Sequence, residues 1–195
     1  MDRMQWEALL RQWSQEVLAA EEYAGMFLPE VVAAGWLGYP GATEAEIRQA
    51  EARLGTQLPP SYREFLKVSN GWRITSSFIK RVWSTDESAW FAERHQSWID
   101  AYLNAEGVAT PVPDSQYFVY DAEQDPVRFR VEYLQSALEI SDEGDSAIYL
   151  LNPKVMTPEG EWEAWFFANW LPGARRYRSF WDLMQAEHES FLELG

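Results

Sequence analysis

The chain of 195 residues has no cysteine, and its 31 acidic against 16 basic side chains give a formal net charge of −15 at pH 7. Without cysteine it forms neither disulfides nor thiolate metal sites, which is typical of a protein in a reducing cytoplasm. A charge of this sign and size repels nucleic-acid phosphates and anionic lipids, so it argues against direct binding to either. No apolar run has the length needed to cross a bilayer.

Residues 1–35 are predicted to form a helical lead-in to the rest of the chain. Within residues 2–24, apolar side chains recur at the spacing of one helix face: Trp6, Leu9, Leu10, Trp13, Val17 and Ala20. Such a stripe is typical of a helix that faces the core, with a groove for a partner as the alternative. The charged, interrupted N-terminus lacks the pattern of a secretory signal peptide.

Residues 41–72 contain two helix signatures separated by a rigid hinge. Thr43 and Glu46 match a capping box, and Gly55 stands where a helix C-cap glycine belongs. Pro59-Pro60 fix two φ angles, so they end a preceding helix and allow a new one to start.

The second of these helices is predicted to turn one apolar side towards the core, formed with Leu58, Tyr62, Phe65 and Leu66. Asn70-Gly71 then ends the helix, and Gly71 is expected to have a positive φ or to approach another backbone closely.

The combined spacing of these pieces resembles the SUKH superfamily. The matching pieces are Gly41-Ala42-Thr43, Leu54-Gly55, Leu58-Pro59, Tyr62 to Leu66 and Asn70-Gly71, preceded by Trp36-Leu37-Gly38. The resemblance implies a sheet with helices packed against it. That superfamily includes fungal cell-wall-synthesis regulators and bacterial immunity proteins that neutralise secreted toxins, so the resemblance also implies a protein-binding role.

Beyond residue 72 the pattern changes from mainly helical to mainly extended. Predicted strands cover residues 72–83, 117–120, 137–141, 147–151 and 162–170, with 128–133 as a further strand or a turn. Two more helices are predicted, one capped by Ser84 or Thr85 and closed by Gly107, the other capped by Ser179 with Asp182. Asn152-Pro153 is expected to stop the strand before it.

This order of elements predicts an α+β fold. Short turns between neighbouring strands favour a mainly antiparallel sheet, against which the helices pack. The length is that of a single domain over residues 1–195, with the lead-in at 1–35 and the SUKH-like core at 36–195.

The sequence offers little support for catalysis. It has no phosphate-binding loop and no nucleophile elbow, and His95 and His188 lie on separate predicted helices without a second ligand at zinc spacing. One of these histidines is expected to be partly buried and the other to lie on the surface. We therefore predict no catalytic residue, no cofactor and no metal ion.

Two acidic motifs have alternative interpretations. Asp142-Glu143-Gly144-Asp145 is typical of a hairpin tip, with a protein contact or a calcium loop as alternatives. Glu161 and Glu163 flank Trp162 on a predicted strand, so both carboxylates are expected on one face. They favour a polar sheet face, with glycosidase-like chemistry as the alternative.

Acidic residues are concentrated in residues 114–172, where twelve acids stand against three bases for a net charge of −9. Solubility alone accounts for such a charge, or else it marks a docking surface for a basic protein. The candidate surface comprises Asp121, Glu139, Asp142, Glu143, Asp145, Glu161 and Glu163. Trp72 and Trp162 are candidate anchors, and Trp165 and Trp170 pose the same choice between core and interface.

The favoured function is a non-enzymatic immunity protein that covers the active site of a basic toxin domain, often a nuclease in the family that the motif resembles. The alternative is a SUKH-type regulator or scaffold that binds a housekeeping partner. A hydrolase that uses the acidic residues is the third hypothesis.

Overall fold

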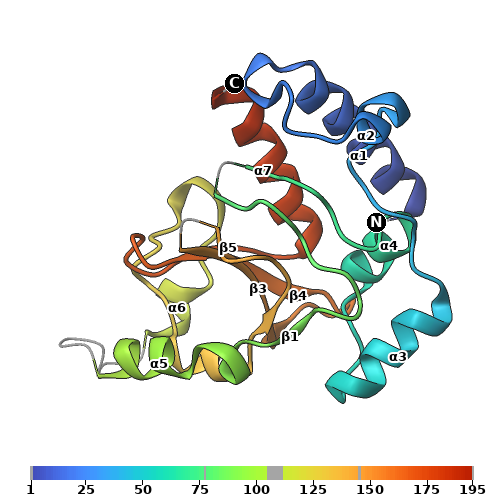
Figure 1. The fold of residues 1–195 in the computed structure, drawn as a ribbon. Coiled ribbons are helices and arrows are strands. Elements are labelled where there is room, and N and C mark those ends of the chain that lie inside the picture. Colours follow the sequence, from blue (N-terminus) through green and yellow to red (C-terminus); the bar gives the residue numbers. More distant parts are fainter. Residues whose placement is uncertain (1, 77, 105–111, 145, 195) are drawn as a thin grey trace.

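A computed structural model describes residues 2–76, 78–104, 112–144 and 146–194. Helices precede, flank and follow one sheet (Figure 1). The helices of the first half are α1 (Arg3–Ala19), η1 (Glu21–Tyr23), α2 (Pro29–Ala34), α3 (Glu44–Leu54), α4 (Pro60–Val68) and α5 (Phe91–Leu103). Those of the second half are α6 (Asp114–Tyr117), η2 (Asp121–Glu123), η3 (Val131–Ser136) and α7 (Phe180–Leu194). Among the described residues, none of these helices has the length and apolarity to cross a membrane.

The sheet has five strands in the order in which they follow along the chain, and each neighbouring pair is antiparallel. The strands are β1 (Ala89–Trp90), β2 (Leu138–Glu139), β3 (Ala147–Met156), β4 (Trp162–Ala168) and β5 (Ala174–Tyr177). The α+β fold and its antiparallel sheet confirm the prediction from the sequence.

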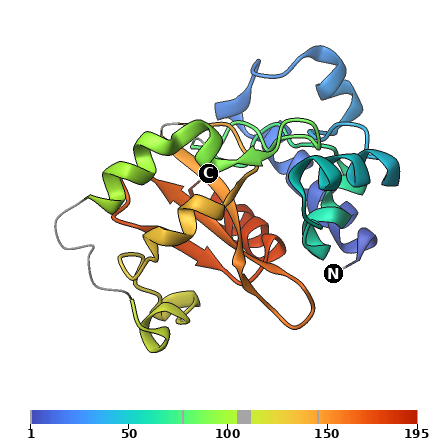
Figure 2. The ribbon, with the colours of Figure 1, turned by 90° about the horizontal axis from the view of Figure 1, so that it is seen from below.

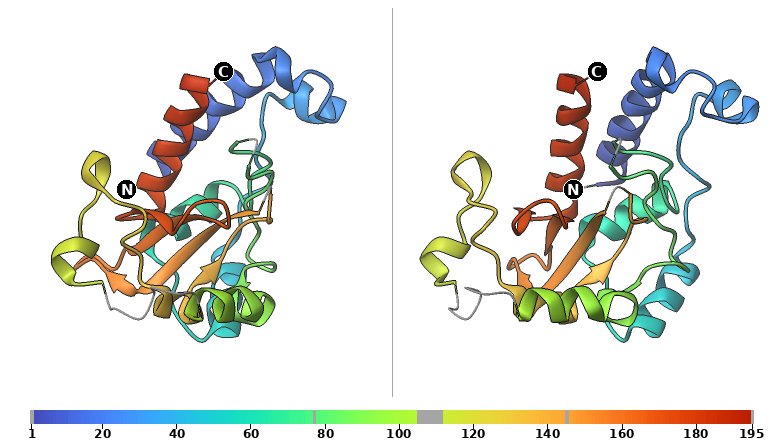
Figure 3. Two further views of the ribbon diagram at one scale, coloured as in Figure 1. Left: turned by 90° about the vertical axis from the view of Figure 1, so that its left-hand side faces the viewer. Right: turned by 60° about the vertical axis from the view of Figure 1, so that its left-hand side comes forward.

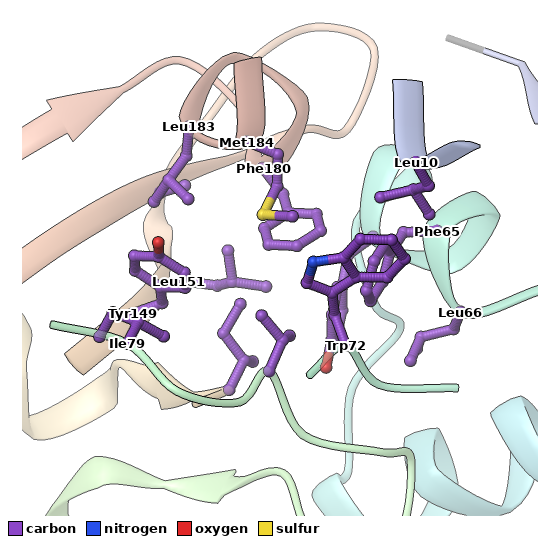
Figure 4. Packing of buried hydrophobic residues seen from close by; sticks show 14 of the residues in the cluster. Leu10, Phe65, Leu66, Trp72, Ile79, Tyr149, Leu151, Phe180, Leu183 and Met184 are labelled. Atoms are coloured by element: carbon purple, nitrogen blue, oxygen red, sulfur yellow. The ribbon is translucent and has the colours of Figure 1, made fainter. Parts of the chain in front are cut away.

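Successive residues of β3 and β4 face opposite sides of the sheet and enter two separate cores. On one side, Tyr149 and Phe166 pack with α1, α4 and α7. Figure 4 shows this core, in which Phe65, Trp72 and Phe180 surround the side chains that rise from the sheet. On the other side, the alternate strand residues form a smaller core with side chains of α5 and η3. Figure 2 shows the ribbons of these two helices on this side of the sheet, seen from below.

The α3–α4 pair forms as its local sequence predicts. Thr43 and Glu46 make both hydrogen bonds of the capping box, and Gly55 has the left-handed conformation with φ 69°. Pro60 is the first residue of α4, and the predicted inner side of this helix is buried: Leu58, Tyr62, Phe65 and Leu66. Gly71 has φ 105°, as predicted, and its own backbone lies close to that of Val82.

The lead-in packs into the same core as the rest of the chain. Trp6 lies between Phe65 of α4 and Phe180 of α7, with ring centroids 5.3 and 5.6 Å away. Trp13 is also fully buried and contacts Trp72. The apolar stripe of the first helix is therefore core, although the helix ends at Ala19 rather than near residue 24.

Several predicted helix and strand boundaries are wrong. The carboxylate of Glu87 accepts hydrogen bonds from Ser84, which closes a turn, and α5 begins only at Phe91. In the range 72–83, Trp72 and Val82 form isolated bridges, and the described residues of this range form no strand. Residues 114–117 form α6 where residues 117–120 were predicted as a strand.

Two further predictions of strands differ from the structure, because the backbone is irregular at both places. For residues 128–133 a strand or a turn was predicted; these residues form no strand, and the 3₁₀ helix η3 begins at Val131. Asn152-Pro153 does not end β3, because a bulge between Asn152 and Met156 allows pairing with β4 to resume at Trp162.

We expect Phe65→Ala to lower the free energy of unfolding by about 3–5 kcal/mol, because the ring is fully buried among Trp6, Tyr62 and Phe180. Urea unfolding measures this loss. Phe118→Ala is the matched control, since Phe118 is 46% exposed and should cost far less. Equal losses in the two variants would show that the packing around Phe65 is wrong.

We expect Gly71→Ala to destabilise the fold more than Gly55→Ala. Both glycines have positive φ, which costs alanine about 1 kcal/mol, but a Cβ at Gly71 would also lie 3.0 Å from the carbonyl oxygen of Val82. A Cβ at Gly55 meets no atom within 4 Å. Thermal unfolding of both variants tests the ranking, and the reverse order would contradict it.

Candidate functional site

The structure removes the two predicted tryptophan anchors from the surface. Trp72 is 0% exposed, packs against Trp36 and donates its indole N–H to the carbonyl oxygen of Ile74 at 2.8 Å. Trp162 is 2% exposed and belongs to the same core. The prediction that either ring anchors a partner is therefore wrong, because the fold itself uses both.

Glu163 is also buried, at the centre of a polar network under the sheet. Its carboxylate lies 3.5 Å from the buried guanidinium of Arg176. It accepts four hydrogen bonds, from the hydroxyls of Tyr117 (2.6 Å) and Tyr120 (2.8 Å), the indole of Trp165 (2.7 Å) and the amide of Asn152 (3.1 Å). A carboxylate so fully engaged holds the structure together and is not available to a partner.

Glu139 and Glu161 are likewise committed within the chain. Glu139 is buried and lies 3.1 Å from Nε2 of His95. Glu161 accepts hydrogen bonds from the backbone N–H and the hydroxyl of Ser61, at the start of α4. Because Glu161 meets α4 while Glu163 points to the opposite side, the two carboxylates do not form the pair that the hydrolase hypothesis needs.

The remaining predicted acids do not form one face either. Asp142 is paired with Arg81 at 3.2 Å and accepts a hydrogen bond from the indole of Trp83. Asp121 is exposed and lies 3.0 Å from Arg178. Glu143 is exposed, and Asp145 lies outside the described residues. Five of the seven predicted acids are therefore paired with other groups of the chain itself.

Both histidines are largely buried and each faces a carboxylate, so the expectation of one surface histidine is wrong. His95 lies against Glu139, and His188 of α7 lies 2.5 Å from Glu16 of α1. Within the described ranges, no group of three or more His, Cys, Asp or Glu side chains is placed to hold a metal ion.

One hollow, of ≈ 770 Å³, lies between α3, α4 and the β3–β4 turn. Some of its charged side chains are paired, Arg63 with Glu44 and Glu51, and Glu64 with Lys67 beside the hollow. The lining still carries more acidic than basic side chains, with Asp2, Glu44, Glu51, Glu64 and Glu159 against Arg48 and Arg63.

A second kind of hollow, of ≈ 560 Å³, combines aromatic rings with carboxylates, and we call it the aromatic–acidic pocket. It lies where η1, the loop before β1, the β4–β5 region and α7 meet. Its lining residues are Glu22, Tyr23, Ser76, Phe78, Phe166, Trp170, Arg175, Glu187, Ser190, Phe191 and Glu193.

Five rings from four parts of the chain line the aromatic–acidic pocket. Phe78 lies 5.2 Å from Trp170 and 6.3 Å from Phe166, measured between ring centroids. Tyr23 lies 6.1 Å from Phe191. Trp170 is 48% exposed, so of the four tryptophans considered as candidate anchors it is the one placed on the surface.

Glu187 provides a nearly buried carboxylate to this pocket, with 7% of the residue exposed. The hydroxyl of Tyr149 donates a hydrogen bond to Oε2, and that hydroxyl also lies 2.7 Å from the hydroxyl of Thr75. Burial raises the pKa of Glu187 to about 7, against the opposing effects of the Tyr149 hydrogen bond and of Arg175. This carboxyl therefore changes charge near neutral pH.

The backbone adds negative potential at the same end of the molecule. The C-terminal ends of α1 and α7 lie together, as Figure 3 shows, and His188 and Glu16 join the two helices. Neither helix has a basic residue in its last turn to offset the negative end of its dipole. Glu22 and Glu193, both exposed, add full charges at the pocket.

An adjoining hollow of ≈ 660 Å³, the α2 pocket, shares Glu22 and Tyr23 with the aromatic–acidic pocket. Its apolar wall includes Met26 and Leu28, which are largely exposed. The two hollows together form an indented surface on both sides of η1.

Comparison with known proteins gives one family. The model of the SMI1 / KNR4 family (SUKH-1) matches residues 41–186. No curated protein matches the chain. The matched range supplies Phe78, Phe166 and Trp170 to the aromatic–acidic pocket, whereas Tyr23 and Glu187 lie outside it. The pocket is therefore built jointly by the matched range and by the segments before and after it.

We expect the stability difference between wild type and Glu187→Gln to depend on pH. The pKa of Glu187 rises from 4.5 to about 7 on folding, so the folded state holds the proton more tightly. The resulting stabilisation is fully present below about pH 4.5 and is lost as the pH rises through 7. The loss is on the order of 3 kcal/mol.

Urea unfolding of both proteins at several pH values between 4.5 and 8 measures this effect. Glutamine keeps an acceptor for Tyr149 and never ionises. The free energy of unfolding of the variant, relative to that of the wild type, should therefore increase with pH across this range and then become constant. A constant difference over the whole range would contradict a raised pKa at Glu187.

Proposed function

This chain belongs to the SMI1/KNR4 family (SUKH-1), and from that membership we propose that it is a non-enzymatic immunity protein that neutralises a basic toxin domain by covering its active site. The observation that best supports a basic partner is the aromatic–acidic pocket, at an end of the molecule where two helix C-termini converge. The partner-binding surface proposed here therefore centres on α7 and η1. The exposed Glu143 and Asp121 do not belong to its centre.

The electrostatic field accounts for the speed of the proposed encounter. A net charge of −15 attracts a basic domain from a distance, and such steering raises association rates by about 10-fold to 1,000-fold. Salt at physiological strength limits its reach to a Debye length of ~8 Å. The association rate should therefore fall as the salt concentration rises.

Exposed apolar groups account for affinity once the two proteins meet. Trp170 provides a large ring that a partner can cover, and Met26 and Leu28 extend the apolar surface on the other side of η1. Interfaces gain most of their energy from a few such groups when they are desolvated. In this proposal, covering the toxin's active site needs no chemistry from the immunity protein, and it takes place in the cytoplasm.

The first test isolates the partner. The full chain serves as bait in lysate of the source cells at low salt, and the captured protein is identified by mass. That protein is then expressed alone and together with this chain. We expect it to be basic, to stop growth when expressed alone, and to be harmless when co-expressed. An acidic partner would contradict the proposal, and a harmless housekeeping partner would favour the regulator hypothesis.

The second test places the surface. We expect the double variant Glu22→Lys/Glu193→Lys to slow association with the captured partner by at least about 10-fold and to weaken its salt dependence. The control is Glu93→Lys/Glu132→Lys, which changes net charge equally on exposed positions of α5 and η3, on the other side of the sheet. Binding kinetics at two ionic strengths measure both, and equal effects would remove the α7–η1 end from the interface.

A further inference from the structure

We propose that the aromatic–acidic pocket receives the side chain of a lysine or arginine from a partner protein. The inference rests on the proposed function only for the identity of the protein that carries this side chain. The chemistry of the occupant follows from the pocket itself, which has aromatic rings in its walls, two exposed carboxylates and one nearly buried carboxyl group.

The rings provide the walls. Cations bind over the faces of Trp, Tyr and Phe because the ring quadrupole is negative there, at up to about 6 Å from the centroid. Phe78, Phe166 and Trp170 contact one another through tilted and edge-on arrangements, and Tyr23 and Phe191 form a second pair. The methylene groups of a long side chain would pack against the same rings.

The carboxylates favour a positive charge at two depths. Glu22 and Glu193 are exposed, whereas Glu187 is almost fully buried. Tyr149 engages Oε2 of Glu187, and within the described part of the chain no hydrogen bond engages its Oε1. A cationic head group that enters the pocket would therefore meet a carboxylate oxygen with free acceptor capacity.

The same groups argue against other occupants. An anion would meet three carboxylates and two helix C-termini, all of which repel it. An uncharged apolar side chain would gain contacts with the rings but would donate no hydrogen bond to Oε1 of Glu187. Among the described lining residues, Arg175 is the single basic one, and it is exposed.

Binding of a cation should release a proton. Burial raises the pKa of Glu187 to about 7, so near neutral pH much of it is protonated. The groups that surround it are Tyr149 on β3, Arg175 and Tyr177 on β5, and Glu22 and Glu193 at the pocket. A bound cation favours the ionised form, so its affinity should rise with pH by about tenfold between pH 6 and pH 8.

The test uses three peptides with the full chain: Ac-Gly-Lys-Gly-NH₂, Ac-Gly-Arg-Gly-NH₂ and an uncharged control with norleucine in place of lysine. The indole N–H signal of Trp170 is followed by NMR during each titration. We expect the two cationic peptides to shift this signal saturably, and the norleucine peptide to bind at least about tenfold more weakly. Equal binding of norleucine, or no shift with any peptide at 50 mM, would overturn the proposal.

Two variants test the charges of the pocket against a merely structural role. Glu187→Gln should weaken lysine-peptide binding at pH 8 and abolish its dependence on pH. Arg175→Ala should strengthen binding, because it removes a competing positive charge from an exposed position. Glu132→Gln, on the opposite side of the sheet, should change neither. Unchanged affinity and unchanged pH dependence in Glu187→Gln would overturn the proposal.

The outcomes for this pocket and for the proposed function are separable. Specific binding of the cationic peptides, together with the capture of an acidic or harmless partner, would support the pocket and contradict the immunity role. Conversely, a captured basic toxin whose affinity is unchanged by Glu187→Gln and by Trp170→Ala would support the immunity role and overturn the inference about the pocket.

Discussion

The buried pair of Glu163 and Arg176 constrains much of the architecture. Neither charge reaches solvent, so each needs partners within the fold. Glu163 takes them from the Tyr117, Tyr120, Asn152 and Trp165 side chains, and Arg176 donates to the carbonyl oxygen of Tyr117. The pair thereby fastens α6 and the loop that follows it to β3, β4 and β5. Loss of either charge would leave the other buried and uncompensated.

This internal use of charge extends to several carboxylates of the acidic half of the sequence, which were predicted to form a docking surface. Its carboxylates hold residues in place: Glu161 at the start of α4, Glu139 against His95, and Asp142 against Arg81. Exposed acids and aromatic rings occur together at the ends of α1 and α7. Counting charged residues along the chain gives the net charge. It does not show which of these residues are paired or buried within the fold.

Local chemistry made part of this structure predictable. The capping box at Thr43, the hinge at Pro59-Pro60 and the strained turn at Gly71 depend on residues a few positions apart, and all three have the predicted geometry. Where the outcome depends on distant partners, prediction from sequence was wrong. Glu139 and Glu161 were assigned to a docking surface but pair with His95 and with Ser61, and the ring of Trp72 was weighed as an anchor but fills the core. The aromatic–acidic pocket could not be predicted, because Tyr23, Phe78 and Glu187 meet only in the folded chain.

The segments that form the aromatic–acidic pocket are far apart in the sequence, and this determines when the protein becomes able to bind through it. The β3–β4–β5 meander joins neighbours in sequence, and such local pairing involves short loops and forms early. The pocket instead needs η1, near one end of the chain, to meet the last turns of α7, near the other. It is therefore complete only when synthesis has passed α7 and this helix has packed beside η1. Recognition through this pocket would thus report on the quality of folding, because a nascent or partly unfolded molecule lacks the site altogether.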